Sequence, residues 1–162
     1  MTSPAKDSST ILVTGGAGFI GSHIVRRLLR DGFAVRVLDN FATGKRSNLA
    51  EVENQIELIE ADMTDPDAAR LAVRGAICIF HQAAIPSVPR SVADPLGSNH
   101  TNVTGTLNML EAARLENVPR FVYAASSSAY VDTEVLPKTD AMIPNPLSPY
   151  AVAKPAGEHY CR

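Results

Sequence analysis

Tyr150 and Lys154, near the end of the sequence, have the types and spacing of a proton-transfer pair. Four residues apart, they would share one face of a helix that Ser148 and Pro149 are expected to begin. The ammonium would stabilise a phenolate and bring the pKa of the tyrosine toward the working pH. Such a pair means nothing alone, but it becomes a strong signal beside a glycine-rich nucleotide-binding turn and a serine at a strand end.

A glycine-rich turn of this kind lies in residues 10–23. The apolar run 11–13 predicts a buried strand, and apolar residues at helical spacing predict a helix soon after it. Gly15 would permit the tight turn, Gly18 would let a diphosphate approach the backbone, and Gly21 would let the helix pack against the strand. The helix N-terminus would then offer free N–H groups to the phosphates. The alternative, incidental glycines in a flexible turn, is disfavoured by the flanking strand and helix.

Asp39 ends a second predicted strand, residues 34–38, and stands eighteen residues past Gly21. A carboxylate in that place can accept both hydroxyls of an adenosine ribose and would repel a 2′-phosphate. This favours NAD over NADP. Two alternatives stay open: Asp39 could be a loop residue without a partner, and Arg46 in the polar turn that follows could hold a phosphate.

Strands and helices alternate along the rest of the sequence, as in a parallel α/β sheet. Strands are predicted at 56–60, 76–80 and 120–125, and helices at 66–75, at 95 to about 116 and from 149 onward. The long helix is expected to bury Val103, Leu107, Leu110 and Ala113, and loops are expected at 85–94 and 129–147. Three serines, Ser126–Ser128, follow the strand at 120–125, at the sheet end where ligands bind in open α/β folds.

Several polar residues near the predicted strand ends have two interpretations. His81 could act as a base or could be a structural residue at the end of a strand. Arg90, in a loop with Ser87, could bind an anionic substrate group or could be a solvated surface residue. The small residues after Gln82 would let the backbone approach a cofactor, and Asn102 needs a reason to lie inside a helix.

Composition narrows the class of protein. At 162 residues we expect a flexible tail at 1–9 and one domain at 10–162. A net charge of −2 gives no electrostatic argument for nucleic acid or a membrane surface, and no apolar run is long enough to span a bilayer. The two cysteines, Cys78 and Cys161, lack metal-ligand spacing, so we expect no metal site and a cytoplasmic location.

The motifs together resemble the extended short-chain dehydrogenase/reductase family, and within it the NAD-dependent nucleotide-sugar epimerases and dehydratases. The resemblance covers residues 10–162 and rests on Thr14–His23, Asp39–Asn40, Asp62, His81–Ala84, Asn102–Thr106, Ala125–Ser128 and Ser148–Lys154. Residues 81–91, with the serine run, look most like UDP-sugar 4-epimerases. The resemblance implies a Rossmann-type doubly wound parallel sheet with strand order 3-2-1-4-5, interrupted before the last strands and the substrate lobe.

The resemblance also implies site roles. Tyr150 would be the base, Lys154 its partner and a ligand of the nicotinamide ribose, and Ser126 a second catalytic hydroxyl. The implied NAD contacts are Gly15, Gly18, Phe19, Ile20, Gly21, Asp39, Asn40, Asp62, Met63, Gln82, Ala83, Ala84, Asn102, Tyr150 and Lys154. The implied substrate contacts are Ser87, Arg90, Ser126, Ser127 and Ser128. The expected partners are a UDP-hexose or UDP-N-acetylhexosamine and a second copy of the protein in a homodimer.

The implied reaction is transient oxidation of the sugar at C4 by hydride transfer to NAD, rotation of the 4-keto sugar and re-reduction. Dehydration is disfavoured, because family dehydratases carry an Asp-Glu pair where this sequence has Ser127 and Ser128. Val131 stands where the family usually has glycine. Pro155 is expected to kink or fray the last helix near Lys154 and to leave the lysine amine less well fixed than in family members. The alternatives are another reductase or epimerase of the family, and a non-catalytic NAD-binding fragment.

Overall fold

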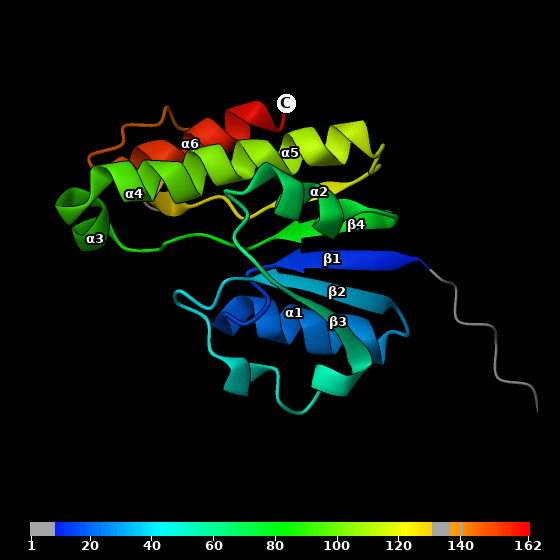
Figure 1. The fold of residues 1–162 in the computed structure, drawn as a ribbon. Helices are drawn as coiled ribbons and strands as arrows, with labels where there is room; N and C mark the ends of the chain where they lie inside the picture. Colours follow the sequence, from blue (N-terminus) through cyan, green and yellow to red (C-terminus); the bar gives the residue numbers. More distant parts are fainter. Residues whose placement is uncertain (1–8, 131–136, 140) are drawn as a thin grey trace, which may run out of the picture.

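Short runs rich in Val, Ile and Leu form a parallel sheet in the computed structural model, which describes residues 9–130, 137–139 and 141–162. The strands are β1 (Thr10–Thr14), β2 (Ala34–Asp39), β3 (Ile56–Glu60), β4 (Ala76–His81) and β5 (Phe121–Tyr123). Their order within these residues is β3-β2-β1-β4-β5, and every neighbouring pair is parallel (Figure 1). The predicted Rossmann-type fold and its strand order are confirmed.

Helices connect the strands and cover both faces of the sheet (Figure 1). They are α1 (Phe19–Arg30), α2 (Pro66–Val73), α3 (Val88–Ala93), α4 (Pro95–Asn99), α5 (Thr106–Leu115) and α6 (Pro149–Tyr160). Short 3₁₀ turns lie at Arg46–Asn48, Glu53–Gln55 and Ser127–Tyr130, and a π-helical turn, His100–Gly105, joins α4 to α5. The Asp65 side chain accepts a hydrogen bond from the backbone N–H of Asp67, so α2 begins with the predicted cap and proline.

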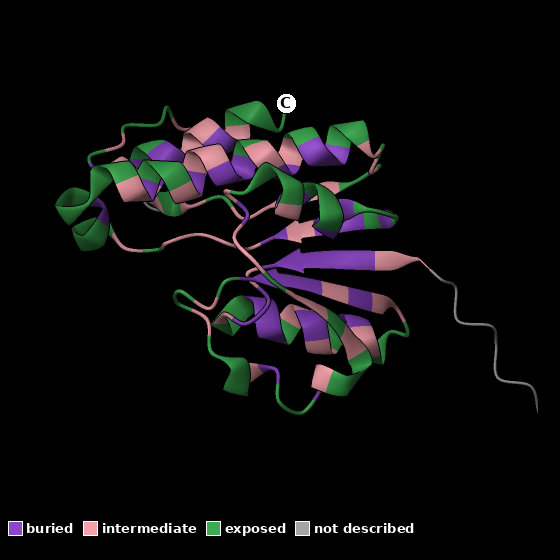
Figure 2. Ribbon diagram, in the orientation of Figure 1, coloured by how far each residue is buried: buried purple, intermediate pink, exposed green. Residues whose placement is uncertain are grey.

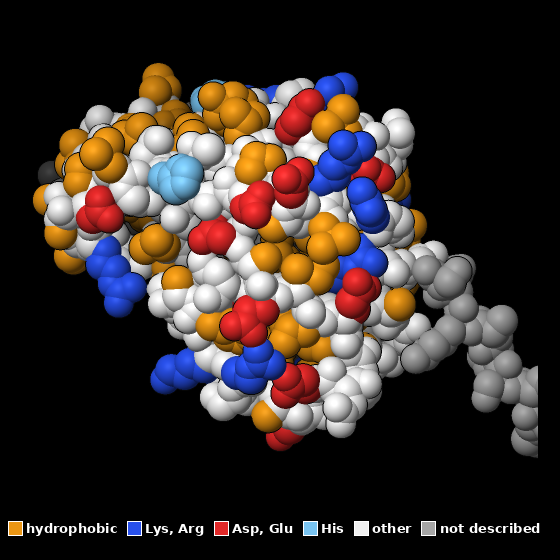
Figure 3. All heavy atoms as spheres, viewed as in Figure 1, with side chains coloured by type: hydrophobic (Ala, Val, Ile, Leu, Met, Phe, Trp, Pro, Cys, Tyr) orange, Lys and Arg blue, Asp and Glu red, His pale blue; other side chains and the backbone are white. Residues whose placement is uncertain are grey.

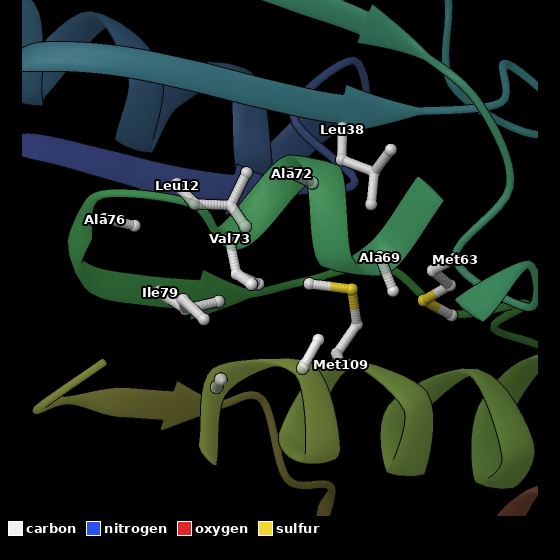
Figure 4. Close-up of a cluster of buried hydrophobic side chains, with 11 residues drawn as sticks. Leu12, Leu38, Met63, Ala69, Ala72, Val73, Ala76, Ile79 and Met109 are labelled. Carbon is white, nitrogen blue, oxygen red and sulfur yellow. The ribbon is translucent and has the colours of Figure 1, made fainter. Parts of the chain in front are cut away.

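Alternating side chains of the strands build two apolar cores, one on each face of the sheet. On the α1 face, Ile11 and Val13 of β1 pack with Val25 of α1. On the opposite face, Leu12 packs with α2 and α5, including Val73 and Met109 (Figure 4). Burial on both faces explains the apolar run Ile11–Val13 in β1, and Figure 2 shows this strand buried over most of its course.

The long helical run buries a different face from the one predicted. Residues 95–115 are helical, but Leu107 is 40% exposed, whereas Asn102, Thr106 and Met109 are buried. The π-helical turn holds one more residue per turn than an α-helix, which rotates the following side chains around the axis. The two polar residues tolerate burial because each finds a hydrogen-bond partner: Asn102 bonds to Ile85, and Thr106 to the Asn102 carbonyl. Of the predicted stripe, Ala113 is buried.

The segment 85–94 is not the uninterrupted loop predicted, because it contains α3. The Ser87 hydroxyl accepts a hydrogen bond from the Arg90 backbone N–H at 3.2 Å and caps this helix, and Pro89 lies in its first turn, where a proline is tolerated. Local capping chemistry therefore turns a proline-containing loop into a short helix.

The prediction that Pro155 frays the last helix and loosens Lys154 is wrong. Helix α6 continues unbroken through Pro155 to its end. Proline offers no N–H to the carbonyl four residues earlier, which costs about 3 kcal/mol in a helix interior. Contacts with the end of the sheet offset this cost: the Tyr123 hydroxyl donates to the Lys154 carbonyl at 3.2 Å, and Lys154 Nζ donates to the Ala124 carbonyl at 2.9 Å.

Two sequence expectations concern residues outside the described ones: positions 1–8 of the expected tail, and Val131. Across the described ranges, no helix has the length and apolar character needed to cross a membrane. Figure 3 shows acidic and basic side chains interspersed on one face, without a field of a single sign.

Candidate active site

A cavity of about 450 Å³ opens at the carboxyl ends of the strands. Its lining includes all but one of the residues expected to contact the cofactor. They are Gly15, Gly18, Phe19, Ile20, Gly21, Asp39, Asn40, Asp62, Met63, Gln82, Ala83, Ala84, Tyr150 and Lys154. Segments that lie far apart in the sequence therefore meet at one cavity, and the exception, Asn102, is buried behind it.

The turn after β1 is shaped by glycines that have no room for a side chain. Gly15 has φ +67°, and a Cβ there would lie 2.7 Å from the backbone of Ala83. A Cβ on Gly21 would lie 2.2 Å from the Gly15 carbonyl oxygen, so α1 packs directly against the turn. Helix α1 begins at Gly18 without a side-chain cap, which leaves its first N–H groups available to an anion.

Asp39 is buried, with 8% of its surface exposed, and both carboxylate oxygens are engaged. One accepts from the Ala17 backbone N–H and the other from the Phe41 backbone N–H, each at 2.8 Å. The carboxylate thus ties the glycine turn to the end of β2 while still lining the cavity. Asp39 is therefore the last residue of β2 and is held by two backbone N–H groups.

Asn40 and Asp62 form a polar pair at the ends of β2 and β3. Asn40 Nδ2 donates to one Asp62 oxygen at 2.7 Å, and the Thr64 backbone N–H and hydroxyl donate to the other. Partial burial acts to raise the pKa of Asp62, but these hydrogen bonds outweigh it and hold the pKa below the ordinary value. The carboxylate is therefore ionised and acceptor-only at neutral pH.

Arg46, the alternative phosphate ligand, is engaged elsewhere. Its guanidinium pairs with Glu53 and Glu60 and lies over the Phe41 ring. It does not line the cavity. This geometry favours the ribose interpretation of Asp39 over phosphate binding by Arg46.

Tyr150 and Lys154 both face the cavity from α6. Lys154 is 5% exposed, its amine donates to the Ala124 carbonyl, and it lies 6.0 Å from the centre of the Tyr150 ring. Burial lowers the pKa of Lys154 to about 8. The helix thus presents a phenol and an amine one turn apart to the same space.

The residues expected to contact substrate do not line this cavity. Ser126 directly precedes the 3₁₀ turn after β5 and is hydrogen-bonded at 2.8 Å to Ser128 within that turn, which also holds Ser127. Ser87 caps α3, and Arg90 is exposed. Ala125, beside Ser126, does line the cavity, so the serines stand just past its edge.

His81 has the geometry of a structural residue. It is 1% exposed, with Nδ1 2.9 Å from the Thr14 hydroxyl and Nε2 3.1 Å from the Thr106 hydroxyl. Thr106 donates to the Asn102 carbonyl and Thr14 accepts from the Ala83 N–H, so the network assigns a neutral imidazole protonated at Nε2. Burial and, to a smaller degree, the Lys154 charge lower the pKa of His81 to about 3.

Two hydrogen bonds to the Ile85 backbone explain why Asn102 lies inside the helical run. Its side chain accepts from the Ile85 N–H at 2.8 Å and donates to the Ile85 carbonyl at 3.2 Å. The backbone after β4 is thereby fixed beside the cavity. The preceding residue on the π-helical turn, Thr101, lines the cavity itself.

Sequence reasoning missed part of the lining. These residues are Leu38, Ala42, Thr43, Gly44, Ala61, Ile85, Pro86, Thr101, Ala124 and Ala125. Most are neighbours of predicted residues. Gly44 carried a usable signal as a glycine in a polar turn, because a Cβ there would lie 2.9 Å from the Ala17 side chain and 3.1 Å from Asp39.

A parallel sheet of this order, with an uncapped glycine turn and carboxylates at two strand ends, defines a dinucleotide-binding α/β fold. Residues 11–162 match the NAD dependent epimerase/dehydratase family, and the chain belongs to that family.

Its relatives include UDP-glucose 4-epimerase from Mycolicibacterium smegmatis, 46% identical over 153 residues, which cover 92% of this chain and 49% of the relative. Among solved structures, the UDP-glucose 4-epimerase of Thermus thermophilus in complex with NAD is 43% identical with a TM-score of 0.87, covering 94% of this chain and 49% of that one. The Thermotoga maritima UDP-glucose 4-epimerase with UDP-glucose is 36% identical with a TM-score of 0.88. The match covers 94% of this chain and 50% of that one. The chain thus spans about half the length of these relatives.

Proposed function

We propose that this chain is the cofactor-binding and proton-transfer half of an NAD-dependent nucleotide-sugar 4-epimerase, with a UDP-hexose or UDP-N-acetylhexosamine as substrate. The observation that carries the proposal is that Tyr150 and Lys154 line the same cavity as the glycine turn, Asp39 and Asp62. The known activity of the UDP-glucose 4-epimerase relatives supports it.

The residues around the cavity fit NAD. The glycine turn leaves a cradle that side chains would fill, and the free N–H groups of α1 suit a diphosphate. Asp39 would hold the adenosine ribose, Asp62 the adenine and Lys154 the nicotinamide ribose. A bound NAD would supply reversible hydride transfer at C4 of the sugar.

The chain's own residues would handle the proton. Tyr150 would take the proton from the sugar O4 hydroxyl and later give it back, and the Lys154 ammonium would stabilise the phenolate between these steps. Ser126 would donate a second hydrogen bond to the same oxygen once substrate extends past the edge of the cavity. Ser127 and Ser128 cannot act as the acid and base that loss of water requires, so epimerisation is favoured over dehydration.

A homodimer and a cytoplasmic location belong to the proposal as well. Cys78 is buried and Cys161 exposed, and both are free thiols, as a reducing compartment permits.

The proposal is tested with a chimera in which residues 10–162 replace the matching half of the M. smegmatis enzyme. We expect the chimera to bind NAD, measured by calorimetry, and to interconvert UDP-glucose and UDP-galactose. A chimera that binds NAD and UDP-glucose but does not epimerise would contradict the assigned chemistry. A folded 162-residue chain that does not bind NAD would contradict the assigned cofactor site.

A further inference from the structure

Tyr123, the last residue of β5, contacts Lys154 at two points. Its hydroxyl donates to the Lys154 backbone carbonyl at 3.2 Å, and the Lys154 amine lies 5.0 Å from the centre of its ring. The next residue, Ala124, accepts the hydrogen bond from that amine. Two consecutive residues at the end of β5 therefore hold both the backbone and the side chain of Lys154.

Gly157 provides the space that this contact needs. A Cβ at position 157 would lie 2.4 Å from the Tyr123 hydroxyl oxygen and 2.6 Å from Cζ. Glycine is an unfavourable residue in a helix interior, and Gly157 is buried in α6 two residues after a proline. The close approach of the Tyr123 hydroxyl gives a physical reason for a glycine at this position.

The sheet holds the Tyr123 ring rigidly. The ring stacks on His81 with centroids 5.9 Å apart and an interplanar angle of 17°. His81 is itself fixed at both ring nitrogens by Thr14 and Thr106. Burial raises the pKa of Tyr123, so its hydroxyl stays protonated and remains a donor over the whole working range of pH.

We propose that Tyr123 is a positioning residue for Lys154: its hydroxyl anchors the helix backbone at Lys154, and its ring seats the ammonium where the cofactor ribose would bind. The proposal rests on the function proposed above for Lys154 toward NAD. It also accounts for the firm placement of Lys154 directly before Pro155, because the anchor comes from β5 and not from α6 itself.

A direct test follows the Lys154 amine by ¹³C NMR of the 162-residue chain labelled at lysine Cε. The sequence has four lysines, Lys6, Lys45, Lys138 and Lys154, so Lys154→Met assigns the signal. Burial should give wild-type Lys154 a titration midpoint near a pKa of about 8. The ionisable groups that face the amine are His81, Tyr123 and Tyr150.

Tyr123→Phe keeps the ring but removes the hydroxyl that anchors the Lys154 backbone, so the helix can shift and the amine gains access to water. The Lys154 midpoint should then rise by about 0.5 or more toward its ordinary value. Gly157→Ala, which displaces the same hydroxyl, should also raise the Lys154 midpoint. It is the variant to measure if Tyr123→Phe folds poorly. Tyr160→Phe is the matched control, because Tyr160 is an exposed tyrosine on the same helix. A Lys154 midpoint that is the same in the wild type and in the folded Tyr123 or Gly157 variant would overturn the proposal.

NAD affinity supplies a second readout. Tyr123→Phe should weaken NAD binding about fivefold in the wild-type background and less than about twofold in the Lys154→Met background, since its effect passes through Lys154. An equal loss in both backgrounds would assign Tyr123 a purely structural role and overturn the proposal. If Lys154→Met alone leaves NAD affinity unchanged, the function proposed for Lys154 fails, and the NMR midpoint decides the role of Tyr123 separately.

Discussion

The nucleotide end and the substrate end of the site differ in how firmly this chain builds them. At the nucleotide end, Asp39 and Asp62 are bound to neighbouring groups on two sides and line a defined cavity. At the substrate end, Ser126 is bonded within its own turn, and Arg90 is exposed outside the cavity. In the proposed function, the residues that would hold the cofactor stand near strand ends of one sheet and line the cavity. Those that would contact substrate stand on or directly before short helical segments outside it.

Removing the Tyr150 hydroxyl should have the largest effect, and on chemistry alone. In the chimera, Tyr150→Phe should lower kcat for epimerisation about 10³-fold, because Tyr150 is the residue proposed to exchange the O4 proton. NAD affinity should change less than about threefold, since the nucleotide end is intact. Steady-state kinetics and calorimetry measure the two effects. If Tyr150→Phe keeps a tenth of the wild-type activity, Tyr150 is not the base that exchanges the O4 proton.

Lowering the pH should reduce the free energy of unfolding of the chain through protonation linked to His81. The pKa of this buried imidazole is about 3, below the ordinary value near 6.5, so the unfolded chain takes up a proton first as the pH falls. Its contribution is complete above pH 6.5 and is lost progressively toward pH 3, amounting to about 5 kcal/mol in full.

Urea unfolding at a series of pH values measures this loss. Replacing His159, on the exposed end of α6, by Gln should leave the slope between about pH 6.5 and 4.5 unchanged, whereas His81→Leu should flatten it. A His81→Leu variant that keeps the wild-type slope would show that another group causes the acid sensitivity.

The choice between NAD and NADP should depend on Asp39. We expect NAD to bind about tenfold or more tightly than NADP, and Asp39→Asn to narrow that ratio about fivefold by removing the charge that repels a 2′-phosphate. Glu60→Gln, which releases one partner of Arg46, is the control and should leave the ratio within about twofold. If NADP affinity rises strongly in the Glu60→Gln control, Arg46 and not Asp39 controls the choice between NAD and NADP.

The smallest effect is expected from Arg90→Ala. This side chain lies outside the cavity, so NAD affinity should change less than about twofold, while the KM of the chimera for UDP-glucose rises. A clear loss of NAD affinity would mean that the two ends of the site are less separate than the structure indicates.

The residues predicted for the nucleotide end line one cavity, and local sequence signals position most of them. Gly15, Gly21 and Asp39 sit at fixed distances along one strand-turn-helix-strand unit. Gly21 and Asp39 meet their constraints within that unit, whereas Gly15 is also confined by Ala83 after β4. The alternation of strands and helices predicted a parallel sheet, whereas its strand order came from the resemblance to the epimerase family. Tyr150 and Lys154 could be paired in advance because four residues make one helical turn.

Where prediction failed, the deciding contacts were long-range. The buried face of the helix at 95–115 depends on a π-helical turn and on Asn102 reaching Ile85, neither of which a simple apolar period contains. The effect of Pro155 was judged from the helix alone, whereas Tyr123 on a distant strand holds the neighbouring residue. These outcomes depend on packing partners that sequence spacing does not identify.

The most direct test of the central claim is to follow the Lys154 ¹³Cε resonance while NAD, and separately AMP, is titrated into the 162-residue chain. AMP can fill only the adenosine end, beside Asp39, whereas NAD should reach Tyr150 and Lys154 at the other end of the same cavity. We predict that NAD shifts the Lys154 resonance and that AMP binds without shifting it. Saturation with NAD that leaves the Lys154 resonance unmoved would contradict the proposal that one cavity joins the nucleotide to the proton-transfer pair.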